Sequence, residues 1–326
     1  MRISILIVTK KYSERELFSS WDHLALDEEI MFEVIVAEGC NPSTQRNELA
    51  NVARGEYLLF FDEDSEPDFK ILLEYLEVIK NFPEAAIFGG PSLLKTKSNN
   101  LHQILNKFFS SYLGIGPFKS RYNSLGSVRI TNEKELILSN LLIKKDYFTK
   151  SGGFDHGLYP GEENDYIKRQ KGNPIIYNPL AVVYRFPRET LKDFFNQMYS
   201  YGKGRAKHLG WSTAELIFLL PAIYAIYFTT LFTLPFLFQF ESLKLLYLPI
   251  LIYFFSIIVI SALEFHTNIF LVLASALCFA FGHFFYGLGV LFGLCKYRIL
   301  PRGFRGDKKL ENLKIFQLKD FNSLRN

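Results

Sequence analysis

The first 90 residues of the chain alternate short apolar runs with stretches of helical spacing. The runs Ile3–Val8, Phe32–Ala37 and Tyr57–Phe61 are of the kind expected for strands that a parallel sheet buries on both faces. Between the last two, Ser43–Arg54 has the spacing of a helix, with Pro42 directly before it. This order predicts an α/β domain with a Rossmann-like sheet that binds its ligand at the carboxyl ends of the strands. Further strands are predicted at Leu136–Ile143 and Ile175–Val183.

Three long apolar runs follow in the last third of the chain. Leu216–Phe240, Leu245–Leu263 and Thr267–Cys295 contain no Asp, Glu, Lys or Arg over 25, 19 and 29 residues. About 20 apolar residues span the hydrocarbon core of a bilayer, and a soluble helix is rarely apolar on every face for so long. Residues 212–295 are therefore predicted to form an α-helical transmembrane region of about three segments.

Amphipathic and basic segments flank these runs. Residues 189–211 mix large apolar side chains with Lys and Arg, which is typical of a helix on a membrane surface. The tail 296–326 carries nine Lys or Arg against three Asp or Glu, and the positive-inside rule places such a tail in the cytoplasm. Three full crossings would separate this tail from the first domain. Either one run does not cross, or the longest contains a hairpin, or the tail crosses despite its charge; Pro221 and Pro235 make the first run the one expected to be broken.

The N-terminal residues and the cysteines bear on the compartment. The apolar run near the N-terminus is about six residues long and charged residues follow it, so no signal peptide is predicted there. Cys40, Cys278 and Cys295 lack metal or disulfide spacing, which fits a reducing compartment. We therefore expect a cytoplasmic domain 1–188, a surface helix 189–211, a multi-pass region 212–295 in the inner membrane, and a basic cytoplasmic tail 296–326.

The sharpest chemical signal is the pair Asp62 and Asp64 at the end of the third strand. Two carboxylates at this spacing after a buried strand are costly unless a cation lies there. Mg²⁺ or Mn²⁺ favours carboxylate oxygens together with substrate phosphates. The alternative is a solvated acidic turn that caps a helix starting near Asp68, and the pair alone does not decide between the two.

Several segments together resemble a known family. Val8-Thr9, VIVAEG and RNELANVARGEYLLFFDEDSEP are similar, over residues 1–70, to family 2 glycosyltransferases of the GT-A fold. The block GGFDHGLYPGEENDYIKR resembles the acceptor-side motif of that family. The stretch QMYSYGKGRAKHL resembles membrane-bound members that make bacterial polysaccharides of the succinoglycan type. The resemblance covers nearly the whole chain and implies that residues 1–188 are a GT-A nucleotide-sugar domain.

The resemblance implies roles on the donor side. Thr9 and Glu38 would contact the base of the nucleotide, and Asp62 would lie near the ribose. Asp64, with Asp62 beside it, would hold a divalent Mg or Mn ion on the diphosphate, which offsets charge on the departing nucleoside diphosphate. Arg46 and Asn47 either contact the donor or are groups on the surface of a helix.

The base of an inverting transfer is expected in GEENDYIKR. A carboxylate has to take the proton of the acceptor hydroxyl as that oxygen attacks the anomeric carbon. The family pattern gives this role to the second acid, here Glu163, although Asp is more usual there and Glu162 remains the alternative. Asp165 lies four residues before Arg169, so it is either an acceptor contact or an i,i+4 ion-pair partner.

Further candidates follow the strand that ends at Tyr184. Many relatives place a His there, but this chain has Arg185, a fixed cation that can bind phosphate, so metal ligation at this position is not supported. Gln197, Tyr201 and Arg205 either gate the donor site, or bind a lipid phosphate, or belong to a basic membrane-surface helix.

Two features of the last apolar run also have alternative interpretations. His283 is either functional, as ionisable residues at membrane depth usually are, or hydrogen-bonded to a neighbouring helix. Gly289 and Gly293 have the spacing of a helix-packing face.

The interpretation that fits these features is a membrane-bound inverting glycosyltransferase, a hexosyltransferase in cell-surface polysaccharide synthesis. It would move a sugar from a nucleotide-sugar donor, expected to be a UDP-sugar, to a lipid-linked or glycan acceptor at the cytoplasmic face of the lipid bilayer. Transfer to polyprenyl phosphate is the nearest alternative. A membrane transporter and an inactive nucleotide-binding scaffold are alternatives of another class, and nucleic acid is not an expected partner. The runs offer few charges for a transport pathway, and a scaffold would normally have lost Asp64 or the Glu162/Glu163 pair.

Overall fold

The computed structural model describes residues 1–12, 24, 30–95, 99–170, 172–209, 216–237, 245–266, 268–299 and 313–320. The chain divides into two units, each built from separated stretches of sequence. Unit 1 comprises Met1–Lys95, Pro117–Phe186 and Arg305–Asn326, and unit 2 comprises Thr96–Gly116 and Pro187–Phe304. Most of the basic cluster predicted for the tail, and residues 210–215 and 238–244, lie outside the described residues.

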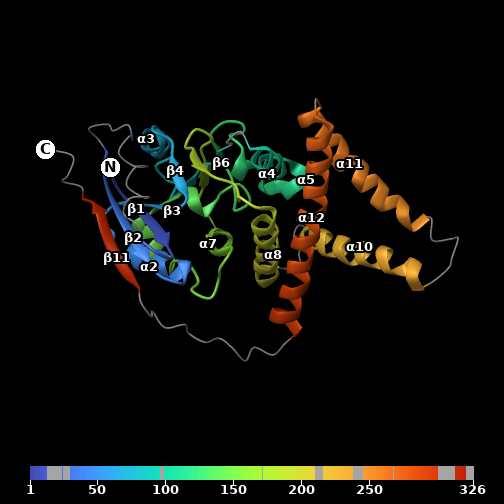
Figure 1. Cartoon of the computed structure of the whole chain (residues 1–326). Helices are drawn as coiled ribbons and strands as arrows, with labels where there is room; N and C mark the ends of the chain where they lie inside the picture. The colour runs from blue at the N-terminus through green and yellow to red at the C-terminus, as the bar shows by residue number, and fades with distance from the viewer. Residues whose placement is uncertain are drawn as a thin grey trace. The chain divides into compact units, whose positions relative to one another are not determined.

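Unit 1 is built on a mixed eight-stranded sheet (Figure 1). In spatial order its strands are β11 (Lys314–Lys319), β2 (Met31–Glu38), β1 (Arg2–Thr9), β3 (Tyr57–Asp62), β8 (Leu141–Lys144), β5 (Ile87–Gly89), β9 (Ile175–Tyr177) and β7 (Arg129–Ile130). β1 pairs in parallel with both β2 and β3, so the carboxyl ends of these three strands meet at one edge. The predicted α/β class and the first three strands are confirmed.

Unit 1 also has a second sheet, whose three strands are β4 (Ser65–Pro67), β10 (Val183–Arg185) and β6 (Ser92–Leu94) in spatial order. β4 follows β3 after a two-residue turn and pairs antiparallel with β10, with Arg185 opposite Ser65. This register brings Arg185 back to the turn that carries Asp64. The long strand predicted at Ile175–Val183 was wrong, because the chain turns at Asn178–Ala181 and its two ends join different sheets.

Helices cover both faces of the large sheet. Alternate residues of β1 point to opposite faces, as strand geometry requires. Ile3, Ile5 and Ile7 pack in the cluster of α3 (Ile71–Asn81). Leu6 and Val8 pack with residues of α2 (Pro42–Val52), α6 (Lys145–Lys150) and α7 (Glu162–Arg169). The strand predicted at Leu136–Ile143 is shorter than expected, because residues Leu138–Asn140 form a 3-10 turn, η2, before β8 begins.

The C-terminal strand β11 completes the edge of the sheet beside β2. Lys314 to Lys319 pair antiparallel with Glu38 to Val34, with one irregularity near the end. Phe316 stacks on Tyr12 with ring centroids 4.3 Å apart. Arg54 ties this edge further, because its guanidinium contacts both Glu33 and Asp320 at 2.8 and 2.7 Å. The chain therefore returns to unit 1 after its apolar runs, which the sequence pattern did not predict.

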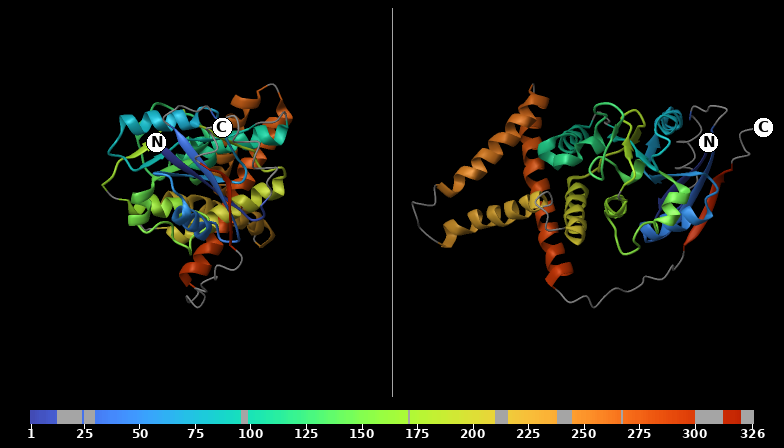
Figure 2. Two further views of the ribbon diagram at one scale, coloured as in Figure 1. Left: turned by 90° about the vertical axis from the view of Figure 1, so that its left-hand side faces the viewer. Right: turned by 180° about the vertical axis from the view of Figure 1, so that it is seen from behind.

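Unit 2 is helical (Figures 1 and 2). Its helices are α4 (Asn100–Ser110), α5 (Tyr112–Ile115), α8 (Leu191–His208), α10 (Leu220–Leu237), α11 (Leu248–Phe265) and α12 (Ile269–Leu294), with a 3-10 turn η3 (Ile217–Leu219) before α10 and a π turn η5 (Cys295–Ile299) after α12. By length and composition, two helical segments, Leu245–Phe265 and Ile269–Tyr297, could cross a bilayer, and Ile217–Leu231 is a shorter apolar helix. The division into domain, surface helix, membrane region and tail stays a prediction.

Helix α12 is the centre of unit 2. Gly289 lies against α8 so closely that an added Cβ would sit 2.1 Å from the carbonyl oxygen of Tyr199, and a Cβ on Gly293 would sit 2.6 Å from Ala206. A side chain larger than hydrogen at Gly289 would therefore push α8 away. His283 lies 2.6 Å from the hydroxyl of Tyr253 and 3.0 Å from the carbonyl oxygen of Gly114. Its ring and the two glycines thus have helix-packing partners.

Candidate active site

Asp62 ends β3 and Asp64 lies in the turn that follows it. Arg46 Nη2 contacts Asp62 Oδ1 at 2.6 Å. Arg185 lies between the two carboxylates, with Nη1 3.7 Å from Asp62 Oδ2 and Nη2 3.0 Å from Asp64 Oδ2. Two arginines thus balance the acidic pair, which is the compensation that buried or half-buried carboxylates require.

Glu162 and Glu163 open α7. Their helix begins after Gly161, whose φ of 105° lies in the left-handed region that favours glycine. The acids of the first turn, Glu162, Glu163 and Asp165, lie where the helix dipole favours negative charge. Gly161 therefore fixes where the helix starts, and with it the direction of both glutamates.

The two glutamates have different surroundings. Glu162 is fully buried, and its Oε1 lies 2.6 Å from Arg46 Nη1. Burial raises the pKa of Glu162, and the Arg46 guanidinium opposes that rise. Glu163 is slightly more accessible and accepts hydrogen bonds from Arg121 Nη1 at 3.2 Å and Asn164 Nδ2 at 3.0 Å. Of the two, only Glu162 is bound to the arginine that also holds Asp62.

Arg46 joins the acidic turn to α7. Its guanidinium is 3% exposed and bridges Asp62 and Glu162, which lie 100 residues apart in sequence. Its Nε has no hydrogen-bond partner among the described residues. The guanidinium therefore fixes the distance between the predicted donor side and the predicted acceptor side.

Replacing Arg46 by Met is expected to lower the free energy of unfolding by about 3–5 kcal/mol, because it leaves Glu162 buried without its cation. Arg2→Met is the matched control: the Arg2–Glu56 pair is half exposed at 3.5 Å, so its loss should cost about 1 kcal/mol or less. Urea unfolding followed by circular dichroism measures both. Equal stability of the two variants would show that the Arg46 bridge is not a structural link.

Arg121, on the 3-10 helix η1 (Gly116–Tyr122), fastens α7 from the other side. Besides Glu163, its guanidinium donates to Asn164 Oδ1 at 2.6 Å, to the carbonyl oxygen of Lys134 at 3.1 Å and to that of Glu133. Its charge also lies 4.7 Å from the centre of the Phe118 ring. The sequence pattern gave no signal for Arg121, since it lies outside every motif.

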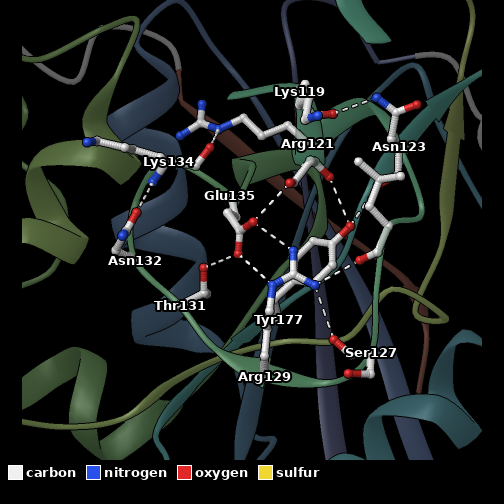
Figure 3. Close-up of polar contacts among 12 residues, drawn as sticks. Lys119, Arg121, Asn123, Ser127, Arg129, Thr131, Asn132, Lys134, Glu135 and Tyr177 are labelled. Carbon is white, nitrogen blue, oxygen red and sulfur yellow. Dashed lines mark hydrogen bonds and ion pairs between the residues drawn. The ribbon is translucent and has the colours of Figure 1, made fainter. Parts of the chain in front are cut away.

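A hydrogen-bonded cluster supports η1 and the loop that follows it (Figure 3). Glu135 accepts from Arg129 Nη2 at 2.7 Å, from Ser120 at 2.9 Å and from Thr131. Burial would raise the pKa of Glu135, but the donors outweigh it and the pKa is lowered. Tyr177 donates to the carbonyl oxygen of Ser120 at 2.9 Å and stacks under Arg129 at 4.3 Å. These contacts hold Ser120, the residue directly before Arg121, by both its hydroxyl and its carbonyl oxygen.

The residues predicted to contact the base of the nucleotide, Thr9 and Glu38, lie at the carboxyl ends of β1 and β2. Thr9 donates to Glu63 and accepts from Lys11 N at 3.1 Å. Glu38 accepts from Tyr12 N at 2.8 Å, a hydrogen bond that lowers the pKa of Glu38, and Lys314 of β11 lies 3.5 Å away. Because β1 and β2 are parallel neighbours, Thr9 and Glu38 are directly paired in register.

Asn47 and Asp165 have local structural partners. Asn47 holds the backbone of Phe154 by both amide atoms, at 2.8 and 3.0 Å, and so fastens the GGFD segment to α2. Asp165 pairs with Arg169 at 2.8 Å, the i,i+4 alternative of the sequence. Gln197, Tyr201 and Arg205 lie on α8 in unit 2, where Gln197 donates to Tyr201 at 2.8 Å and Arg205 lies 4.4 Å from the Phe218 ring.

Asp62 and Asp64 are the residues that could hold a divalent metal. No group of three His, Cys, Asp or Glu side chains in the described part of the chain could hold an ion alone. Mg²⁺ is commonly bound through one or two carboxylates together with substrate phosphates. The pair therefore fits a metal that arrives with a diphosphate, and Arg185 would have to turn from the carboxylates toward that diphosphate.

No family model and no curated protein matches the sequence of this chain. Among solved structures it resembles the mannosyltransferase PcManGT from Pyrobaculum calidifontis, in complex with GDP-Man and Mn²⁺, with a TM-score of 0.57 and 12% identity over 90% of this chain and 87% of that one. S. aureus TarS (16% identity, 61% of this chain and 38% of that one) and its fragment 1–349 with UDP-GlcNAc (13%, 88% and 90%) reach TM-scores of 0.40 and 0.42. The fold is thus similar, over most of the chain, to that of a glycosyltransferase.

Proposed function

We propose that this protein transfers a sugar from a nucleotide-sugar donor to an acceptor hydroxyl with inversion at the anomeric carbon. The observation that carries the proposal is the bridge Asp62–Arg46–Glu162, which holds an acidic turn at the strand ends next to a helix that presents a second carboxylate, Glu163. Sheets of this kind bind ligands at the carboxyl ends of their strands. The likeness of the fold to a glycosyltransferase structure supports the same conclusion.

The residues of the chain have separate tasks in this proposal. Glu163 takes the proton of the acceptor hydroxyl while that oxygen attacks the anomeric carbon, and the bond to the diphosphate breaks on the opposite face. Arg185 turns to the diphosphate and offsets its charge. Thr9 and Glu38 contact the base of the nucleotide. A bound Mg²⁺ or Mn²⁺ ion on Asp62 and Asp64 would supply further charge stabilisation to the leaving group.

The apolar helices of unit 2 favour an acceptor at a membrane. We propose that unit 2 enters the cytoplasmic face of the inner membrane and that the acceptor is a lipid-linked sugar or glycan. The aromatic and basic residues of α8, among them Tyr201 and Arg205, suit a surface that meets lipid phosphates. The choice of UDP-sugar as donor rests on the sequence resemblance alone.

Nucleotide binding tests the donor side. Isothermal titration of UDP and GDP into the purified protein, with and without Mn²⁺, should show binding that is clearly tighter with the metal, because two carboxylates oppose the diphosphate without it. The preferred nucleotide identifies the donor class. Binding of neither nucleotide in the presence of Mn²⁺ would contradict the proposed donor site.

A further inference from the structure

The C-terminal strand β11 begins where the proposed function places the base of the nucleotide. In the register of the large sheet, Lys314 of β11 is paired with Glu38 of β2, and Glu38 is paired with Thr9 of β1. The three residues therefore form one row across three neighbouring strands (Figure 1). Paired residues on one face of a sheet lie close enough for their side chains to interact. Lys314 thus extends the row of residues to which we assign the contacts with the base.

The carboxylate of Glu38 is held at both of its oxygens. Oε2 accepts a hydrogen bond from the backbone N–H of Tyr12 at 2.8 Å, and Oε1 lies 3.5 Å from Nζ of Lys314. The Tyr12 N–H and the Lys314 ammonium both lower the pKa of Glu38, so the group is ionised at neutral pH. Because an ionised carboxylate only accepts hydrogen bonds, its remaining lone pairs suit the ring N–H that uracil and guanine present.

Strand β11 also holds the residue on the other side of this carboxylate. Phe316 lies two residues after Lys314 and therefore points to the same face of the sheet. Its ring stacks on that of Tyr12, with the centroids 4.3 Å apart and the planes 11° from parallel. One partner of Glu38 thus belongs to β11, and the other is stacked on it. The direction of the Glu38 carboxylate therefore depends on a strand that follows the apolar helices in sequence.

The contacts that anchor β11 lie away from Lys314. Toward the other end of the strand, Asp320 forms an ion pair with Arg54 at 2.7 Å, and Gln317 donates to the buried Glu33 at 3.3 Å. The side chain of Lys314 is 64% exposed, and a pair as exposed as this one contributes little to stability. Removing the charge of Lys314 should therefore leave the strand in place and change only the surroundings of Glu38.

We propose that β11 is part of the donor site, and that Lys314 is a positioning residue that holds the Glu38 carboxylate toward the base of the nucleotide. The inference rests on the proposed function and deepens it in two respects. It assigns a role in donor binding to the C-terminal strand, and it restricts the donor to nucleotides whose base has a ring N–H, which are those of uracil and guanine.

Calorimetric titration of the full-length protein in the presence of Mn²⁺ tests the inference with two ligands. The first is UDP or GDP, whichever the natural protein binds more tightly, and the second is inorganic pyrophosphate, which has no base. The variants are Lys314→Met, Lys314→Arg and, as the matched control, Lys319→Met. Lys319 belongs to the same strand and lies 4.8 Å from the Phe32 ring, so its replacement removes the same charge at the other end of β11.

We expect Lys314→Met to bind the nucleotide about fivefold more weakly, the affinity equivalent of one partly exposed ion pair. Its affinity for pyrophosphate and its stability in urea should stay at the natural values. Lys314→Arg should restore nucleotide binding, because it keeps the charge and the donors. Lys319→Met should bind both ligands as the natural protein does. In a protein that already carries Glu38→Gln, adding Lys314→Met should cause no further loss of nucleotide affinity.

Three results would overturn the role of Lys314 while leaving the proposed transfer untouched. Natural nucleotide affinity in Lys314→Met would show that the residue does not act on the site. An equal loss of pyrophosphate affinity would show a general effect of charge, and a further loss in the Glu38→Gln protein would show that Lys314 does not act through Glu38. Failure of the natural protein to bind either nucleotide is a different outcome, since it would contradict the proposed function and this inference with it.

Discussion

Replacing Glu163 by Gln is expected to lower kcat for sugar transfer about 10²- to 10⁴-fold, the usual contribution of a general base. The amide keeps the shape of the side chain, and its oxygen can still accept from Arg121 and Asn164, but it cannot take a proton. Donor affinity should stay close to that of the natural protein, since Glu163 lies on α7 rather than at the strand ends. Transfer of labelled sugar to membranes that contain the acceptor measures kcat, and titration of the nucleotide measures binding.

Glu84→Gln is the matched control for this change, because Glu84 is exposed and lies outside the site. It should transfer sugar at the natural rate. If Glu163→Gln does so too, Glu163 is not the base. The acceptor would then be one without a proton to remove, such as a polyprenyl phosphate that is already ionised at neutral pH, or Glu162 would act instead. In Glu162→Gln, a large loss of kcat with unchanged nucleotide affinity and an unchanged free energy of unfolding would identify Glu162 as the base.

Replacing Asp64 by Ala is expected to lower kcat/KM about 10²- to 10³-fold, the size of effect seen when one electrostatic contact to a developing charge is removed. It should also abolish the gain in nucleotide affinity on adding Mn²⁺. Arg185, no longer held by Asp64 at 3.0 Å, would still meet the diphosphate, so weak metal-independent binding of nucleotide should persist. Activity assays and titrations across a series of Mn²⁺ concentrations measure both effects.

Asp146→Ala is the control for Asp64, since Asp146 is exposed in the first turn of α6. It should leave the Mn²⁺ dependence unchanged. A variant Asp64→Ala that still binds nucleotide more tightly with Mn²⁺ would place the metal elsewhere. Loss of all nucleotide binding, with and without metal, would instead mean that Arg185 does not reach the diphosphate.

The sequence was informative where local pattern and packing agree. Strands β1, β2 and β3 are apolar on both faces, and the helix α2 has a start signal in Pro42, so both could be predicted closely. Short strands such as β9 and β10 could not be predicted in this way. The sequence predicted one strand over Ile175–Val183, yet β9 and β10 join different sheets, because the turn at Asn178 is stabilised by contacts with distant residues.

The individual residues of the candidate site could be predicted from the sequence, but the ion pairs and hydrogen bonds that join them could not. Asp62, Asp64 and the Glu162/Glu163 pair were found from their motifs. That Arg46 joins Asp62 to Glu162, and that Arg121 holds Glu163, depends on pairs separated by 16 to 116 residues in sequence. Strand β11 was missed for a similar reason: its alternation is short, and only its pairing with β2 distinguishes it from the rest of a basic tail.

Mass spectrometry of the product shows directly whether this protein transfers a sugar to an acceptor. Membranes that contain the acceptor are incubated with the purified protein, Mn²⁺ and each candidate nucleotide sugar, and their lipids and glycans are extracted. We expect one species heavier than its precursor by the mass of the transferred sugar, formed by the natural protein and formed far more slowly by Glu163→Gln. Release of free sugar or of nucleotide alone, with no such species for any donor, would contradict the assignment of a glycosyl transfer.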